Sequence, residues 1–102
     1  MWTLDNALPL IQRISPIARR HGFSVALYGS VLDQGESKKD LDLFFIEQDP
    51  DISDVQGCVD EIAKLSEIDH CGEVIACTGG SLCVIWLSHP KRHIDAQFRL
   101  LR

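Results

Sequence analysis

The run DLDLFFI at residues 40–46 places two acidic side chains inside an otherwise apolar segment. Successive side chains of a β-strand point to opposite faces, so Asp40 and Asp42 share one face and the leucines share the other. Two carboxylates this close repel each other unless they share a proton or a cation. The run therefore predicts a strand with one apolar face and one anionic edge, and it requires a fold that brings compensating charge to that edge.

The rest of the pattern places helices and strands around this run. Apolar residues recur at three- and four-residue intervals over residues 4–18, and a second such stripe has Ser53 as its expected N-cap and an end near Asp69. Together these elements predict one α+β domain over residues 1–102, with a mixed β-sheet and helices packed on one face. The strands are expected at residues 23–28, 40–46, 73–77, 82–87 and 92–98.

Two breaks in the pattern leave their local structure open. Pro9 and Pro16 each lack an N–H and crowd the preceding turn, so the first helix is expected to be kinked or split. Residues 30–34 predict a short helical turn that Gly35 closes, and residues 36–39 predict a polar connection.

A third acid repeats the pattern late in the chain, because Asp95 stands between two apolar residues of a predicted strand. If this strand lies beside the DLDLFFI run, the three carboxylates converge on one point. Three converging acids can hold two magnesium ions about 3.5–4 Å apart, the arrangement used for in-line phosphoryl displacement. Glu73 also borders a predicted strand, but it follows a turn and has no apolar residue before it, so Asp95 is the preferred third acid.

The Gly29-Ser30 pair ends the predicted strand at residues 23–28. A glycine there lets the backbone approach a ligand closely, and a helix that starts at Ser30 would present free N–H groups to an anion. Ser30 is also an ordinary helix cap, and the two roles are compatible because the same N–H groups serve both. The pair therefore predicts a phosphate-binding turn that faces the acids.

The formal net charge of −5 argues against binding to long duplex nucleic acid, because such binding needs a dense basic surface. A nucleotide is compatible with this charge, since a metal ion can supply the positive charge that the side chains lack. Asp33 and Glu36 add negative charge near the predicted turn, and the lysine pair at residues 38–39 fits a solvated turn and a phosphate contact equally well. The candidate phosphate contacts are Lys38, Lys39, Lys91 and Arg92.

Together these motifs resemble the nucleotidyltransferase superfamily, whose palm domain is of the DNA polymerase β type. The resemblance rests on an apolar strand followed by GS at residues 29–30, DLD at residues 40–42 and IDA at residues 94–96, and it spans residues 23–98. Within this superfamily, the sequence most resembles the minimal nucleotidyltransferases, which are small proteins that include antitoxins paired with HEPN ribonucleases. The resemblance implies metal binding and catalysis for Asp40, Asp42 and Asp95, and contact with the β- and γ-phosphates for Gly29 and Ser30.

The activity that the resemblance implies is magnesium-dependent transfer of a nucleoside monophosphate from a nucleoside triphosphate, with ATP as the expected donor and two Mg²⁺ ions as cofactors. The acceptor would be a hydroxyl of a protein, a small molecule or an RNA end. No C-terminal helical domain of the kind that larger relatives use follows in this sequence. We therefore expect a protein partner or a second copy of the chain to supply the acceptor site.

A binding module is the alternative function: an antitoxin-like or regulatory protein that acts mainly by pairing with a partner such as a HEPN-type toxin. A degenerate palm with neither activity is disfavoured, because a sequence under relaxed selection should lose buried charges that destabilise the fold when unpaired. The sequence leaves the nucleotide and the acceptor open.

The four cysteines contain no C-x-x-C pair, which argues against a structural zinc site. The N-terminus does not resemble a signal peptide and no run approaches the length of a membrane-spanning helix, so we expect a cytoplasmic protein without a membrane partner. In that reducing compartment we expect free thiols rather than a structural disulfide, although Cys77 and Cys83 can face each other across a turn.

Overall fold

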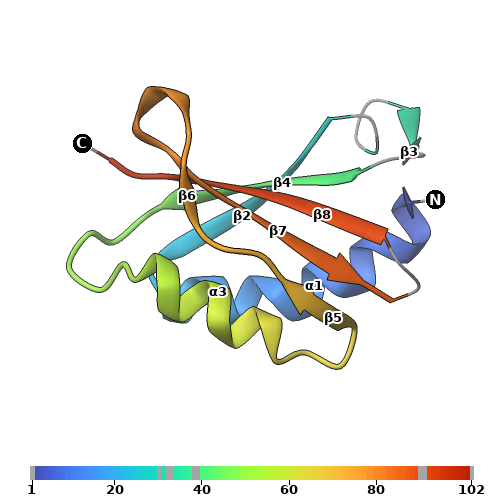
Figure 1. Ribbon diagram of the computed structural model, residues 1–102, viewed down its shortest axis with the longest axis horizontal. Coiled ribbons are helices and arrows are strands. Elements are labelled where there is room, and N and C mark those ends of the chain that lie inside the picture. Colours follow the sequence, from blue (N-terminus) through green and yellow to red (C-terminus); the bar gives the residue numbers. More distant parts are fainter. Residues whose placement is uncertain (1, 30, 32–33, 38–39, 90–91, 102) are drawn as a thin grey trace.

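Helices α1 (Leu4–Arg20) and α3 (Val55–Ala63) lie along one face of a mixed β-sheet, as Figure 1 shows for the computed structural model. The structure describes residues 2–29, 31, 34–37, 40–89 and 92–101. This arrangement confirms the predicted α+β class. The strands of the main sheet are β2 (Phe23–Tyr28), β4 (Asp40–Glu47), β5 (Ile68–Cys71), β6 (Ile75–Ala76), β7 (Leu82–Ser88) and β8 (Arg92–Arg99).

The order of the strands brings distant segments of the chain together at the centre of the sheet. The order is β2-β4-β8-β7-β5, and β6 also pairs with β7. Strands β4 and β8 are parallel, and the other pairs of this sheet are antiparallel. The parallel register sets Asp42 opposite Asp95, although the two residues lie far apart in the sequence.

The hydrophobic core lies between the sheet and the two helices. Along β4 the buried side chains of Leu41, Leu43 and Phe45 alternate with half-buried ones, which is the pattern of a strand with one face in the core. Helix α1 contributes Ile14 and α3 contributes Ile62, both fully buried. Figure 1 shows α1 and α3 on the same side of the sheet, so the acids of β4 lie on the opposite face, called the helix-free face because neither α1 nor α3 covers it.

Helix α1 runs without a break through both prolines, so the predicted split does not occur. Both prolines are exposed, and so are Asp5 and Gln12, whose carbonyl groups lose their helical N–H partners. Water can bond to these carbonyls, which reduces the cost of each proline. Burial of the opposite face, together with the Thr3 capping box, then holds one continuous helix.

The second helix is shorter than the sequence pattern predicts. Asp54 caps α3 by accepting a hydrogen bond from the N–H of Gly57 at 3.0 Å, so the prediction of Ser53 as the N-cap is wrong. The hydroxyl of Ser53 donates instead to the carboxylate of Glu47. The helix ends at Ala63, not near Asp69, and a turn at residues 64–67 leads into strand β5, which pairs with β7.

Two further segments differ from their predicted form. The strand expected at residues 73–77 shortens to β6, where pairing with β7 covers Ile75–Ala76 alone. Part of the expected polar connection forms the short strand β3 (Glu36–Ser37), which pairs with β1 (Trp2–Thr3). The turn before it is helical at its described residues, and the N–H of Gly35 donates to the carbonyl of Val31 at 3.0 Å.

Cys77 and Cys83 form a disulfide bond, so the expectation of free thiols is wrong for this pair. The turn around η1 (Thr78–Gly80) brings their α-carbons to 6.1 Å, a separation that a disulfide can span. Cys58 and Cys71 are free, as expected. Burial raises the pKa of the Cys58 thiol to about 12, so this thiol stays protonated.

Within the described ranges, no helix has the length and apolar character needed to cross a membrane.

Candidate active site

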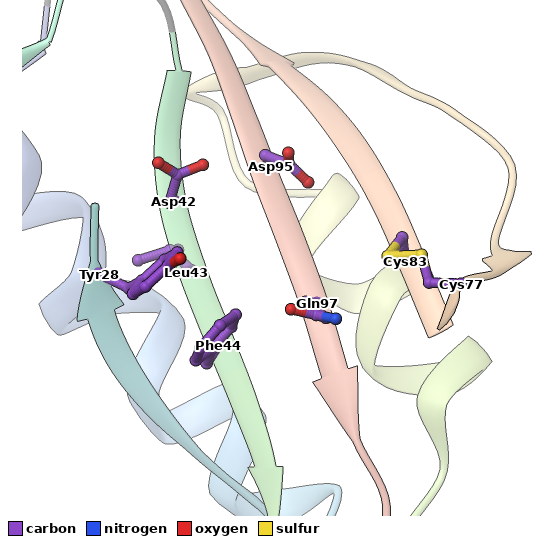
Figure 2. Close-up of a pocket in the computed structure, with 8 residues that line it drawn as sticks. All are labelled: Tyr28, Asp42, Leu43, Phe44, Cys77, Cys83, Asp95 and Gln97. Carbon is purple, nitrogen blue, oxygen red and sulfur yellow. A yellow bond between two sulfur atoms is a disulfide. The ribbon is translucent and has the colours of Figure 1, made fainter. Parts of the chain in front are cut away.

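Three carboxylates meet on the helix-free face of the sheet. Asp42 on β4 and Asp95 on β8 are register partners on adjacent strands, and Figure 2 shows both side chains on the same face. Asp40 precedes Asp42 by two residues and shares its face. One carboxylate oxygen from each acid lies within 4.8 Å of those from the other two. The convergence that the sequence predicts is therefore present, and all three side chains are half-buried.

The electrostatics of this cluster favour a cation. Burial raises the pKa of Asp42, and the charges of Asp95 and Asp40 raise it further. Burial also raises the pKa of Asp95, with the charge of Asp40 as the second cause. Within the described part of the chain, neither carboxylate has a hydrogen-bond or ion-pair partner. His93 is near Asp40, with 3.9 Å between its Nδ1 and a carboxylate oxygen.

Gly29 makes room for one of these acids. Its φ of +82° lies in the left-handed region that favours glycine. A Cβ at this position would overlap the Oδ2 atom of Asp42 and lie 3.1 Å from its Cγ. The Asp42 carboxylate therefore fills the space beside Gly29. The contact of Gly29 with a phosphate stays a prediction.

Among the other predicted phosphate contacts, Arg92 belongs to the described residues. The rest lie outside them, namely Ser30, Lys38, Lys39 and Lys91. The guanidinium carbon of Arg92 lies 4.2 Å from the centre of the Trp2 ring, and the same group donates to the carbonyl of His89 at 3.1 Å. The guanidinium of Arg92 thus already contacts Trp2 and His89, and its contact with a phosphate stays a prediction.

Glu73, the rival third acid, does not belong to the cluster of carboxylates that the described residues form. It lines a second pocket, of about 380 Å³, which also touches Asp95. This position supports the preference for Asp95, because the register of β4 and β8 brings Asp95, not Glu73, opposite Asp42.

A pocket of about 210 Å³ lies beside Asp42 and Asp95 on the helix-free face. Figure 2 shows the side chains that line it. The sequence reasoning missed most of its lining. Strand alternation puts Phe44 on the face of Asp42 and Gln97 on the face of Asp95, so this signal was available. The lining residues are Tyr28, Asp42, Leu43, Phe44, Cys77, Cys83, Asp95 and Gln97.

The arrangement offers an all-oxygen donor set beside a small pocket with an aromatic wall. Carboxylates of this kind suit hard divalent cations such as magnesium, calcium or manganese rather than zinc or copper. No protein-family model and no curated protein matches the chain. Evidence for a function therefore comes from the geometry and chemistry of the site.

Proposed function

We propose that the protein is a magnesium-dependent nucleotidyltransferase with the polymerase β-like palm fold. It transfers a nucleoside monophosphate from a nucleoside triphosphate, with ATP as the expected donor, to a hydroxyl acceptor in the cytoplasm. The observation that carries this proposal is the meeting of Asp40, Asp42 and Asp95 within 4.8 Å, with Asp42 and Asp95 unpaired among the described residues.

The donor set fits magnesium. All three groups are carboxylates, and magnesium in nucleotide enzymes binds one or two carboxylates together with waters and substrate phosphates. The half-buried position leaves one side of the cluster open to a triphosphate. Bound magnesium would neutralise phosphate charge and lower the pKa of the acceptor hydroxyl. By resemblance, the same three acids would hold two ions.

The side chains of the site position the two reactants. Asp40 and Asp42 hold the donor side from β4, and Asp95 faces them from β8, where it orients the acceptor hydroxyl and accepts its proton. The hydroxyl oxygen bonds to the α-phosphorus while the bond from that phosphorus to the leaving oxygen breaks, and pyrophosphate departs. The phosphate contacts that the resemblance implies are Gly29, Ser30, Lys38 and Lys39.

Calorimetric titration with Mg·ATP tests the site. The wild type should bind Mg·ATP, and Asp42→Asn and Asp95→Asn should each weaken this binding by roughly 10–100-fold or more. A loss of this size follows even when only the groups that hydrogen-bond to metal ligands are changed. Asp51→Asn is the matched control, because it removes the same charge from an exposed turn after β4.

Incubation with labelled ATP and candidate acceptors tests the chemistry. Magnesium-dependent label transfer and pyrophosphate release should occur with the wild type and Asp51→Asn, and should disappear with Asp95→Asn. A folded wild type that neither binds Mg·ATP nor releases pyrophosphate from any of the four nucleoside triphosphates would contradict the proposal.

A partner-binding module is the second candidate function, and apolar surface beside the acids favours it. Ile75 and Ile85 are 58% and 49% exposed and line the pocket of about 380 Å³. Exposed apolar surface of this kind is typical of interaction sites. On this alternative, a HEPN-type protein or a second copy of the chain covers the helix-free face. Ile85→Asp should then release the partner, whereas Asp42→Ala should leave the complex and its cellular effect intact.

A further inference from the structure

The pocket beside the acids has an aromatic wall that the proposed transfer reaction does not use. The ring of Tyr28 stacks on Phe44, with centroids 4.5 Å apart and planes 18° apart. The guanidinium carbon of Arg99 lies 4.7 Å from the centre of the Phe44 ring, so Phe44 already has two neighbours. Tyr28 is 51% exposed and lines the pocket, which leaves much of its ring surface open to another planar group.

An amide group lies beside this aromatic wall. Gln97 on β8 is the register partner of Phe44 on β4, and Figure 2 shows the Gln97 side chain beside the Phe44 ring. Its carboxamide can donate two hydrogen bonds and accept others, yet it bonds to no residue in the ranges that the structure describes. A carboxamide of this kind can hydrogen-bond the edge of a nucleobase.

The size and charge of the pocket restrict what it can hold. Sites for drug-sized ligands measure roughly 300–1,000 Å³, so a pocket of about 210 Å³ accommodates one ring system and not a whole nucleotide. Asp42 and Asp95 at one end would repel a phosphate that carries no metal. The disulfide of Cys77 and Cys83 forms an apolar opposite side. These features suit an uncharged, planar heteroaromatic group.

We infer that this pocket binds the nucleobase of a nucleotide whose phosphates or hydroxyl lie at the carboxylates. The base stacks on Tyr28, and its polar edge bonds to the carboxamide of Gln97. This inference rests on the proposed function for the chemistry at the acids. The base belongs either to the donor triphosphate or to a nucleoside acceptor, and the two sources differ in the measurements that follow.

Calorimetry with paired probes separates the base from the phosphates. Mg·ATP carries both, whereas Mg·tripolyphosphate carries no base. If the donor base occupies the pocket, Tyr28→Leu should weaken Mg·ATP binding by roughly 5- to 150-fold, the range for losing one base–aromatic stack, and should leave Mg·tripolyphosphate binding unchanged. Tyr28→Phe keeps the ring and should retain the wild-type affinity. Ile52→Ala, at an exposed residue of the turn after β4, is the surface control.

A second titration tests the acceptor as the source of the base. Adenosine, and then each of the other three nucleosides, is titrated in the presence of saturating Mg·tripolyphosphate. If the pocket holds the acceptor base, Tyr28→Leu should weaken nucleoside binding and leave Mg·ATP binding unchanged. Gln97→Ala should change the order of preference among the four nucleosides, which a purely structural role would not do.

The outcomes distinguish failure of this inference from failure of the proposed function. Equal affinities of the wild type and Tyr28→Leu for ATP and for all nucleosides would overturn the base pocket, even if Asp42→Asn abolished binding of Mg·tripolyphosphate. Nucleoside binding that depends on Tyr28, without any binding of Mg·ATP or release of pyrophosphate, would support the pocket and contradict the transferase. A folded protein that binds none of these probes would overturn both.

Discussion

At the scale of single residues, the side chain of Asp42 packs against the backbone of Gly29. The carboxylate of Asp42 fills the space that a side chain at position 29 would need, and the backbone of Gly29 is in the left-handed region. Any residue with a Cβ must therefore adopt an unfavourable φ and displace the acid at the same time. Glycine is required here by the geometry of a neighbouring strand.

Gly29→Ala should lower stability and weaken Mg²⁺ binding. Left-handed strain costs about 1–2 kcal/mol of unfolding free energy, and displacement of the Asp42 carboxylate should cost roughly 10–100-fold in metal affinity. Gly35→Ala is the matched control, because Gly35 has a φ of +78° and, among the described residues beyond its chain neighbours, no atom within 4 Å of the point that a Cβ would occupy. Denaturant titration and calorimetry should show strain in both variants and a loss of Mg²⁺ binding in Gly29→Ala alone. Equal losses would contradict the contact.

The acids also make the stability of the metal-free protein depend on pH. The folded-state pKa of Asp42 is raised above 3.8, mainly by burial, so the folded state holds this proton more tightly than the unfolded state. Stability contributed by the protonated group is therefore lost as pH rises from 3.8 through the raised pKa. At neutral pH the ionised carboxylate opposes folding unless a cation binds.

Asp42→Asn should therefore raise the melting temperature of the protein in chelator at neutral pH. Its advantage over the wild type should vanish below pH 3.8, where the carboxyl group is protonated in both states. Added Mg²⁺ should reverse the order, because it stabilises the wild type and not the variant. Thermal unfolding at several pH values, with and without Mg²⁺, measures all three effects. A variant that melts below the wild type in chelator at neutral pH would show that the carboxylate is already compensated.

At the scale of elements, the hairpin of β6 and β7 is closed by a disulfide bond that the spacing of its two cysteines in the sequence does not establish. The turn between the strands holds the N–H of Cys77 2.8 Å from the carbonyl of Ser81, and the disulfide joins Cys77 to Cys83 across it. This hairpin borders the pocket beside the acids. A loss of order in this hairpin would therefore change the pocket as well as the edge of the sheet.

Reduction of this disulfide should lower the unfolding free energy by about 2 kcal/mol, the loop-entropy value for a closed loop of this size. The double variant Cys77→Ser/Cys83→Ser should match the reduced wild type and show no response to dithiothreitol. Cys71→Ser keeps the disulfide and should respond as the wild type does. Guanidinium titrations with and without dithiothreitol provide the comparison. An identical response of the wild type and the double variant would argue that the bond contributes nothing to stability.

At the scale of the whole molecule, Glu47 links three parts of the chain. It is 1% exposed at the end of β4, where its carboxylate accepts hydrogen bonds from the hydroxyl of Ser53 and from the N–H of Leu101 at 3.0 Å. The turn after β4 and the segment after β8 are thereby held to the same strand end. Because β4 carries Asp40 and Asp42, this link also supports the position of the site.

Glu47→Ala should lower the unfolding free energy by about 2–3 kcal/mol, because it removes the carboxylate that accepts hydrogen bonds from the hydroxyl of Ser53 and the N–H of Leu101. Ser53→Ala removes one of these hydrogen bonds and should cost about 1 kcal/mol. Denaturant titration gives both values, and hydrogen exchange at Leu101 reports the loss of the chain-end contact. Equal stabilities of the two variants would show that the Leu101 bond does not contribute.

Much of the fold and of the acidic cluster could be predicted because the relevant signals are local. Alternation along DLDLFFI sets which side of β4 carries the acids, and the same alternation marks Asp95 on β8. The continuity of α1 through its prolines and the early end of α3 could not be predicted in this way. The first depends on whether the carbonyls that lose an N–H partner are exposed to water, and the second depends on the pairing of β5 with β7.

The sequence by itself determined strands β2, β4, β7 and β8, the alternation of their side chains and the face that Asp40 shares with Asp42, because strand periodicity depends only on neighbouring residues. Tertiary structure decided that β4 and β8 are parallel neighbours, since pairing of distant segments depends on how the whole chain closes. It also decided the packing of Asp42 on Gly29, the bond between Cys77 and Cys83, and the aromatic pocket beside the acids. Each of these requires contact between segments whose separation in space no local pattern specifies.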